Sequence, residues 1–235
     1  MPDSRSEATS ELLFGELVQV LVQEAQWCKI RVLHDGYEGF VETANCDFSH
    51  STTTHWVSTK ATFVFEKPDI KSTVVQRLMF GSELKLRDFG EQRNWLKLPD
   101  VGFVWAAHCL ALKVPLELSM VEIAQNNYLH APYLWGGRSV DGCDCSGLVQ
   151  MLAMATAISL PRDSGDQEAA LFIDVNYENR GAEDLVYWPG HVGLLKSPDV
   201  LLHSTAHSMR CCIEPLQEVM QRAGAPSSIK RMSKH

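Results

Sequence analysis

The pattern of the chain changes at Pro115, and this change limits the folds open to it. Before Pro115, short apolar stretches such as residues 17–21 and 29–32 alternate with turn residues, which is typical of β-strands. After it, the spacing of apolar residues predicts helices near 118–129 and 144–158. Strand-like segments follow at 184–188, 191–195 and 200–204. Helices followed by antiparallel strands predict an α+β fold behind an all-β region.

A weak repeat divides the all-β region. GELV at 15–18 is echoed by GSEL at 81–84, and GFV at 39–41 recurs at 102–104. Each copy has the size of a small β-barrel, so two barrels are expected. The segment 46–59, rich in Ser, Thr and His, is interpreted as their connection, with a final strand at its end. The predicted domains are residues 11–58, 59–113 and 114–235.

Composition excludes several classes of protein. No apolar run in the 235 residues approaches the roughly 18–20 needed to span a membrane, and the first residues form no secretory signal. The net charge is −8 and no Lys/Arg cluster stands out, so neither nucleic acid nor a membrane is an expected partner. Seven scattered cysteines indicate reduced thiols, and a cytoplasmic location is expected.

A glycine-rich stretch delivers Cys145 to the start of the helix expected after residue 144. Asp144 has the position of an N-cap, where the unpaired amides and the helix dipole favour a thiolate at Cys145. His191 and His203 belong to later strands, and adjacent strands could bring both toward the helix. In that arrangement His191 takes the thiol proton and His203 orients the His191 ring. The alternative is a buried, inert Cys145 with two histidines that only satisfy strand hydrogen bonds.

The order and spacing of five motifs distinguish between these readings. They are PYLWGG at 132–137, DCSG at 144–147, LPRDS at 160–164, GHVG at 190–193 and HS at 203–204. Over about residues 117–215 the chain resembles the NlpC/p60 family of papain-like cysteine peptidases, which cut peptidoglycan stem peptides. The preceding barrels resemble bacterial SH3-like modules, and the whole arrangement is similar to the γ-D-glutamyl-L-diamino-acid endopeptidases.

The resemblance implies a role for each residue of the site. Cys145 is the nucleophile, His191 the base and His203 the third polar residue. Tyr133 lies beside the thiolate and helps to bind substrate or to stabilise the oxyanion, which the Cys145 amide also faces. Asp144 and Ser146 line the pocket, with the Asp144 carboxylate pairing with the ammonium of an N-terminal L-Ala. The other substrate contacts are expected from Trp135, Glu11 or Glu16, and Tyr37.

The sequence departs from the family pattern near these motifs. Cys143 replaces a bulky apolar residue, and Glu183 stands where the family normally has Gly. Arg162 is expected to pair with a carboxylate and Asp163 to cap the next helix, in preference to binding substrate. A second capping pattern is expected at residues 164–167.

We therefore expect a cysteine peptidase that hydrolyses the bond between γ-D-Glu and a diamino acid, diaminopimelate or Lys, in small muropeptides with a free N-terminal L-Ala. The rival functions are an inert peptide- or wall-binding module and an acyl transferase or amidase on the same fold. Cys211 and Cys212 are adjacent, which is unlike the spaced ligands of zinc sites, and no metal or cofactor is expected.

Overall fold

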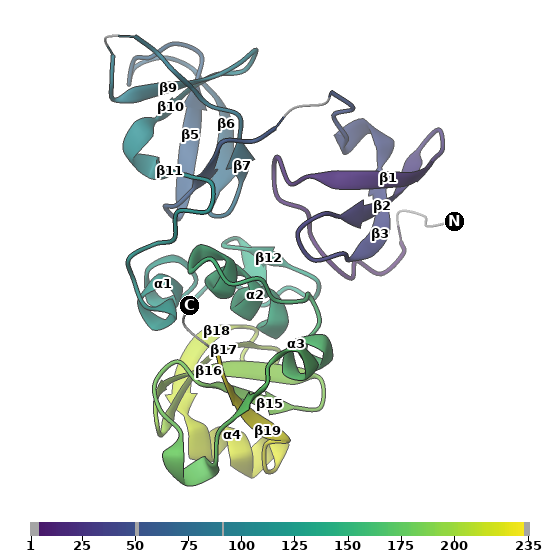
Figure 1. The fold of residues 1–235 in the computed structure, drawn as a ribbon, viewed down its shortest axis with the longest axis vertical. Helices are drawn as coiled ribbons and strands as arrows, with labels where there is room; N and C mark the ends of the chain where they lie inside the picture. Colours follow the sequence, from purple (N-terminus) through teal and green to yellow (C-terminus); the bar gives the residue numbers. More distant parts are fainter. Residues whose placement is uncertain (1–4, 50–51, 91, 233–235) are drawn as a thin grey trace. The chain divides into compact units, whose positions relative to one another are not determined.

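The computed structural model describes residues 5–49, 52–90 and 92–232. The chain forms two compact units (Figure 1). The N-terminal unit comprises residues up to Glu7 and Leu12–Leu116, and the C-terminal unit comprises Ala8–Glu11 and the chain from Glu117 onward. The short segment Ala8–Glu11 therefore belongs with the second half of the chain, although it precedes the first strand.

The first repeat folds into a three-stranded antiparallel sheet. Its order is β1 (Val18–Gln23), β2 (Trp27–Val32) and β3 (Glu38–Glu42), followed by the 3-10 turn η1 (Thr43–Asn45). Alternate side chains of β2 point into a small core formed by Cys28, Ile30 and Val32, as the period of a strand requires. Tyr37 packs against this core.

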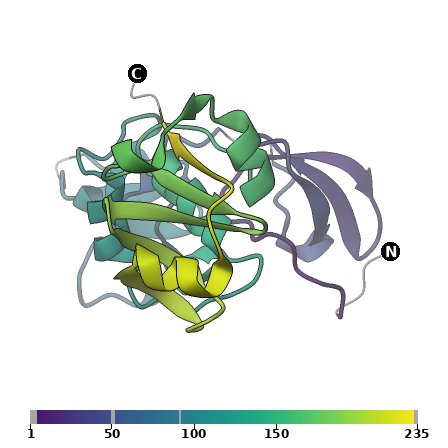
Figure 2. The same cartoon turned by 90° about the horizontal axis from the view of Figure 1, so that it is seen from below.

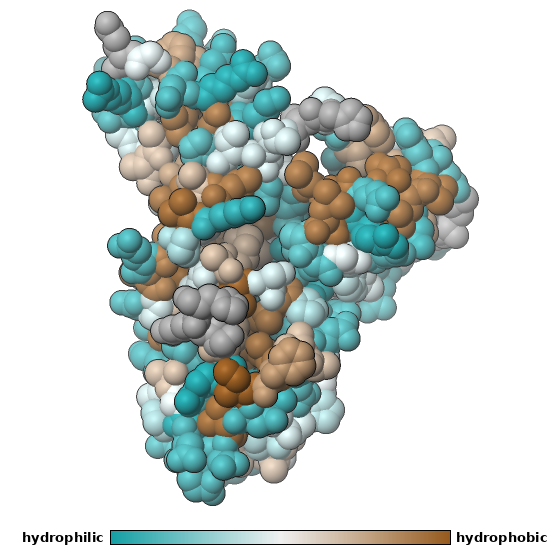
Figure 3. Space-filling view, in the orientation of Figure 1, coloured by the Kyte–Doolittle hydropathy of each residue, from teal (hydrophilic) through white to brown (hydrophobic). Residues whose placement is uncertain are grey.

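This sheet is too small to bury all of its apolar side chains. Val20, Val22, Leu33 and Phe40 are exposed, and Figure 3 shows apolar surface over the sheet. A domain of this size buries a smaller fraction of its surface than a larger one does.

The second repeat folds into two sheets around one core. Their orders are β6-β5-β10-β9-β8 and β11-β4-β7. The elements are β4 (His55–Val57), β5 (Ala61–Phe65), β6 (Val74–Met79), β7 (Glu83–Leu84), β8 (Arg87–Asp88), β9 (Trp95–Leu98), β10 (Gly102–Trp105), η2 (Ala106–His108) and β11 (Cys109–Ala111). The buried core is formed by Val57, Val64, Leu78, Leu84, Leu86, Leu98, Val104 and Cys109.

Strand β4 corrects the expected boundary between the barrels. His55–Val57 pairs with both β11 and β7, and Val57 lies in the core of the second repeat. The strand therefore belongs to the second barrel, so the boundary predicted after residue 58 is wrong. The periodicity of a three-residue strand does not reveal its pairing partner.

The repeat is visible in the backbone. Gly15 and Gly81, the first residues of the two echoed motifs, have φ angles of 80° and 88°. A residue with a side chain rarely adopts this left-handed conformation, so the turn that opens each copy requires glycine.

The C-terminal unit is built on a six-stranded antiparallel sheet of order β14-β19-β15-β16-β17-β18. Its strands are β14 (Ile173–Asp174), β15 (Leu185–Trp188), β16 (His191–Ser197), β17 (Val200–Thr205), β18 (Arg210–Pro215) and β19 (Ser228–Arg231). The remaining elements are α1 (Met120–Asn127), the β12 (Arg138–Ser139) and β13 (Gly142–Cys143) hairpin, α2 (Cys145–Ala155), α3 (Ser164–Ala170), η3 (Tyr177–Asn179) and α4 (Leu216–Ala223).

Helices α2 and α4 both pack on this sheet. Helix α2 contacts β16 and β17, and its side chains are buried almost all round. Helix α4 buries Leu216 and Val219 against Leu195 and Leu201 of the sheet, and Figure 2 shows it beside the last strands. The α+β arrangement of this unit agrees with the sequence pattern after Pro115. Among the described residues, no helix is long and apolar enough to cross a membrane.

The predicted capping patterns of the helices are confirmed in part. The predicted capping box of α1 is present between Ser119 and Glu122. The predicted capping pattern of α3 is wrong, because its N-cap is Asp163 and the Asp163 side chain makes no capping hydrogen bond. Glu183 has a φ of 70°, which accounts for the glycine that the family normally has there. Its carboxylate accepts a hydrogen bond from the Met120 amide at 2.6 Å and so caps α1 from outside.

Candidate active site

The start of α2 holds Cys145 at the end of a glycine-rich loop. Asp144 is the N-cap, and its carboxylate accepts a hydrogen bond from the Gly147 amide at 2.7 Å, as predicted. Cys145 is therefore the first residue of the helix, where backbone N–H groups have no partner within the helix. Cys145 is 6% exposed.

The two histidines lie on neighbouring strands, as expected. His191 is the first residue of β16 and His203 lies in β17, which pairs antiparallel with β16. His191 Nε2 and His203 Nδ1 are 2.7 Å apart. The Cys145 sulfur lies 4.0 Å from the carbonyl oxygen of Gly190 and accepts a hydrogen bond from the Val192 amide, so it contacts the backbone on both sides of His191.

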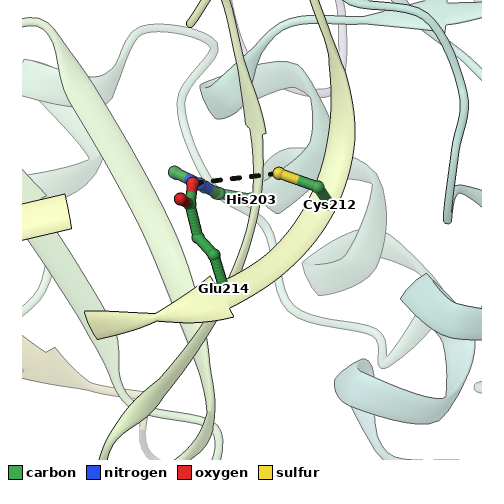
Figure 4. Close-up of side chains that lie close together, drawn as sticks. All are labelled: His203, Cys212 and Glu214. Atoms are coloured by element: carbon green, nitrogen blue, oxygen red, sulfur yellow. Dashed lines mark hydrogen bonds and ion pairs between the residues drawn. The ribbon is translucent and has the colours of Figure 1, made fainter. Parts of the chain in front are cut away.

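A carboxylate that the sequence did not reveal contacts the second histidine of this pair. His203 Nε2 is 2.6 Å from a carboxylate oxygen of Glu214 in β18. Arg222 of α4 donates a hydrogen bond to the same oxygen. His203 pairs directly with Cys212 across β17 and β18, so the two side chains lie on the same face of the sheet. Glu214 follows Cys212 by two residues in β18, so its side chain lies on that face too (Figure 4). Only the strand register brings these residues together.

Burial controls the electrostatics of the site. It lowers the pKa of His191 to about 4, and the neighbouring His203 acts in the same direction. Burial also raises the pKa of the Cys145 thiol, with a further contribution from Asp144. The amides of Val192 and Ser146 act in the opposite direction by hydrogen bonding to the sulfur. The expected preference for a thiolate is therefore outweighed, and the neutral His191 is the group that can accept the thiol proton.

Tyr133 lies near the sulfur with its hydroxyl protonated. Burial raises the pKa of Tyr133 to about 12, and the negative charge of the Cys145 thiolate and of Asp144 would raise it too. The backbone of Tyr133 is held by a hydrogen bond to Met209 at 3.0 Å. A protonated hydroxyl beside the nucleophile can donate to a developing oxyanion.

Asp144 does not have the environment expected of an ammonium receptor. The Arg162 guanidinium donates to both carboxylate oxygens, at 3.0 and 2.6 Å, and the Gly136 amide donates to one of them at 2.9 Å. Ser146 belongs to the same network, accepting a hydrogen bond from Arg162 at 2.9 Å. Both side chains take part in this buried network, and their role in lining the pocket stays a prediction. The expected pairing of Arg162 with a carboxylate is confirmed.

Glu11 lies in the C-terminal unit and holds the loop before Cys145. One of its carboxylate oxygens accepts hydrogen bonds from the amides of Arg138 and Ser139 at 2.8 and 2.9 Å. Gly136 has a φ of 79°, and a side chain there would meet the Ala8 carbonyl oxygen at 2.6 Å. The segment Ala8–Glu11 thus packs against the loop at residues 136–139.

The roles predicted for Trp135, Glu16 and Tyr37 in contacting substrate stay predictions. Trp135 follows Tyr133 in the loop and is 57% exposed, so its role as a wall of the cleft stays a prediction. Glu16 and Tyr37 belong to the N-terminal unit. There Glu16 contacts His34 at 3.1 Å and Tyr37 packs on the β2 core, and their roles also stay predictions.

His203, Cys212 and Glu214 form the one cluster of the described residues whose geometry could suit a metal ion, with ligand atoms within 4.8 Å of one another. The Arg222 guanidinium contacts the Glu214 oxygen that a cation would need. A positive charge at this point disfavours a cation, and hydrogen bonds among the three residues account for their proximity.

Comparison with known proteins identifies both parts of the chain. A model of the NlpC/P60 family matches residues 130–224, and a model of the bacterial dipeptidyl-peptidase Sh3 domain matches residues 1–45. "Dipeptidyl-peptidase 6" of Lysinibacillus sphaericus is 27% identical over 237 residues, covering 92% of this chain and 87% of its own. A "gamma-D-glutamyl-L-lysine dipeptidyl-peptidase" of Bacillus subtilis is 28% identical over 217 residues, covering 83% of this chain and 71% of its own.

Solved structures support the fold. An NlpC/P60 family protein from Bacillus cereus superposes with a TM-score of 0.79 at 20% identity, covering 95% of this chain and 81% of that one. NlpC2 from Trichomonas vaginalis gives a TM-score of 0.50 at 17% identity. The C-terminal unit is thus papain-like, and the N-terminal region is SH3-like. The chain thus carries an NlpC/P60 domain at residues 130–224, preceded by a bacterial SH3 domain.

Proposed function

We propose that this protein is a cysteine endopeptidase that hydrolyses the γ-D-glutamyl–diamino acid bond of peptidoglycan stem peptides. The observation that carries the proposal is made at the N-terminus of α2, where the Cys145 sulfur contacts the backbone on both sides of His191, while His191 contacts His203 at 2.7 Å. The activity in the name of the B. subtilis relative supports the choice of bond.

The reaction proceeds in two halves. Neutral His191 takes the proton of the Cys145 thiol as the sulfur attacks the γ-carbonyl carbon, and the protonated ring then gives this proton to the leaving amine. The amine of the diamino acid departs and a thioester remains on Cys145. His191 next takes a proton from water, the resulting hydroxide attacks the thioester, and the thiol is restored. The Cys145 amide and the Tyr133 hydroxyl donate to the oxyanion in both halves.

We further propose that the substrate is a small peptide with a free N-terminal L-Ala, such as arises in murein recycling. A dipeptidyl-peptidase, as the relatives are named, releases two residues from an amino end. With Asp144 neutralised by Arg162, the ammonium needs another acidic partner. A site built around a charged group rejects substrates without it, since its own charge would be left buried and unpaired.

The test uses three peptides and identifies the products by mass spectrometry. They are L-Ala-γ-D-Glu-meso-diaminopimelate, the peptide in which L-Lys replaces the diaminopimelate, and the diaminopimelate peptide acetylated at its N-terminus. We expect release of the diamino acid from the free peptides and a kcat/KM at least about 100-fold lower for the acetylated one. Equal cleavage of all three would remove the requirement for a free amine. Binding without turnover would indicate a binding module, and an added amine in the product would indicate acyl transfer.

The pH dependence of this activity follows from the burial of His191. The ring accepts the thiol proton only when neutral, and its pKa is lowered from 6.5 to about 4. Activity is therefore retained above pH 4 and lost as the pH falls through that value. The acid limb of kcat/KM, measured while circular dichroism reports that the protein stays folded, should lie near pH 4. An acid limb at the ordinary histidine pKa would contradict this account.

A further inference from the structure

Glu214 occupies a position next to the histidine pair that the proposed reaction does not use. It accepts hydrogen bonds from His203 at 2.6 Å and from Arg222, and the Cys212 thiol lies 3.8 Å from the same oxygen. Figure 4 shows the His203, Cys212 and Glu214 side chains converging from β17 and β18. Because His203 is 1% exposed, water has almost no access to compete for the His203–Glu214 contact.

The charge of Glu214 determines the direction of the hydrogen bonds. Burial alone would raise the pKa of Glu214, but hydrogen bonds from Arg222 and His203 outweigh it and hold the pKa below its ordinary value. Glu214 is therefore a carboxylate at neutral pH and can only accept. His203 must then carry a proton on Nε2.

The proton on His203 decides where the proton on His191 lies. Burial lowers the pKa of both rings, so each is neutral and has a single N–H. With Nε2 of His203 donating to Glu214, its Nδ1 has a lone pair, and His191 must donate its own Nε2–H across the 2.7 Å contact. Nδ1 of His191 is thereby left unprotonated, which is the state a base requires.

We propose that Glu214, held as a carboxylate by Arg222, is a positioning residue that acts through His203 to keep Nδ1 of His191 free to accept the Cys145 proton. This role rests on the proposed function. It goes beyond the Cys145–His191–His203 arrangement by giving the direction of its hydrogen bonds a physical origin.

Reversing the chain of hydrogen bonds shows why the carboxylate matters. If position 214 could not accept, His203 could carry its proton on Nδ1 and donate to Nε2 of His191. His191 would then hold its own proton on Nδ1 and could not act as a base toward the thiol. The Glu214 charge also stabilises the imidazolium that forms on His191 during the reaction.

The titratable groups around His203 are few. They are His191 from β16, Cys212 and Glu214 from β18, His207 after β17, and Arg222 from α4. Of these, Glu214 alone is anionic at neutral pH, because burial raises the pKa of the Cys212 thiol. Among the described residues, a substitution at 214 therefore removes the one negative charge in contact with His203.

The experiment compares the full-length protein with three variants. Glu214→Leu removes the acceptor, and Glu214→Gln keeps an acceptor oxygen without the charge. Glu218→Gln removes an exposed carboxylate from the first turn of α4 and serves as the matched control. Nitrogen NMR of histidine-labelled protein reports which ring nitrogen carries the proton, and steady-state kinetics on L-Ala-γ-D-Glu-meso-diaminopimelate gives kcat and KM separately.

In the wild type and in Glu214→Gln we expect His191 and His203 to carry their protons on Nε2. In Glu214→Leu we expect a mixture of tautomers and a kcat about 100-fold lower with KM unchanged, since a correctly oriented base contributes at least this much. Glu214→Gln should recover part of kcat, because its amide oxygen can still accept from His203 although the charge that stabilises the imidazolium is lost, and Glu218→Gln should behave as the wild type. A purely structural role of Glu214 would not predict this recovery together with the tautomer change.

Two results would overturn the role of Glu214. One is a wild-type spectrum with the His191 proton on Nδ1, and this result does not depend on whether any variant folds. The other is a folded Glu214→Leu protein with unchanged tautomers and kcat. If the wild type cleaves none of the peptides, the proposed function fails, yet the spectra still decide the tautomer assignment.

Discussion

Replacing Cys145 with alanine should abolish hydrolysis of the γ-D-glutamyl bond while the protein still binds the peptide. We expect kcat to fall by at least about 10,000-fold, because a nucleophile and its base act as a unit and neither is effective alone. Quantitative mass spectrometry of the released diamino acid measures the loss, and calorimetric titration measures binding. Iodoacetamide should inactivate the wild type with alkylation at Cys145.

Cys143 provides the matched control for this experiment. It lies two residues before Cys145 and is fully buried, and burial raises the pKa of its thiol to about 12. Cys143→Ala should therefore retain most of the activity. Turnover that survives in Cys145→Ala would exclude the proposed mechanism, whatever the substrate.

Removing the Arg162 guanidinium should destabilise the C-terminal unit strongly. Arg162 and Asp144 are 2% and 5% exposed, so Arg162→Met leaves a buried carboxylate without its cation. Breaking a buried ion pair from one side costs about 3–5 kcal/mol of unfolding free energy. Hydrogen–deuterium exchange of the α2 amides, followed by mass spectrometry, measures this free energy for the unit that contains them.

Two further variants separate burial from charge. In the double variant Asp144→Asn with Arg162→Met, no charge is left uncompensated, and part of the lost stability should return. Asp199→Asn breaks an ion pair with Arg180 in which the Asp199 side chain is 82% exposed, and it should cost much less. If the α2 amides exchanged hydrogen for deuterium at the same rate in Arg162→Met and in Asp199→Asn, the buried pair would not stabilise the unit as proposed.

Features with a local cause could be predicted from the sequence. The N-cap at Asp144 and the capping box from Ser119 to Glu122 depend on residues no more than three apart, and both are confirmed. The pairing of the strands that carry His191 and His203 is also confirmed, because strands adjacent in the sequence tend to be adjacent in a sheet.

Features that depend on distant contacts could not be predicted. Asp144 has a sequence position that suits substrate binding, but its partner Arg162 is 18 residues away, and their contact depends on how the loop before α3 folds. Glu214 meets His203 only through the register of β17 and β18. Glu11 and Arg138 are 127 residues apart, so no local pattern connects them.

The segment Ala8–Glu11 means that the C-terminal unit is not one contiguous stretch of the chain. Ser10 accepts a hydrogen bond from Arg162 at 3.1 Å, and the Glu11 carbonyl accepts one from the Arg138 side chain at 3.0 Å. Exchanging the barrels by recombination at Pro115 would separate two buried guanidinium groups from these acceptors. Modular inheritance of the barrels therefore has to preserve a few residues in front of them.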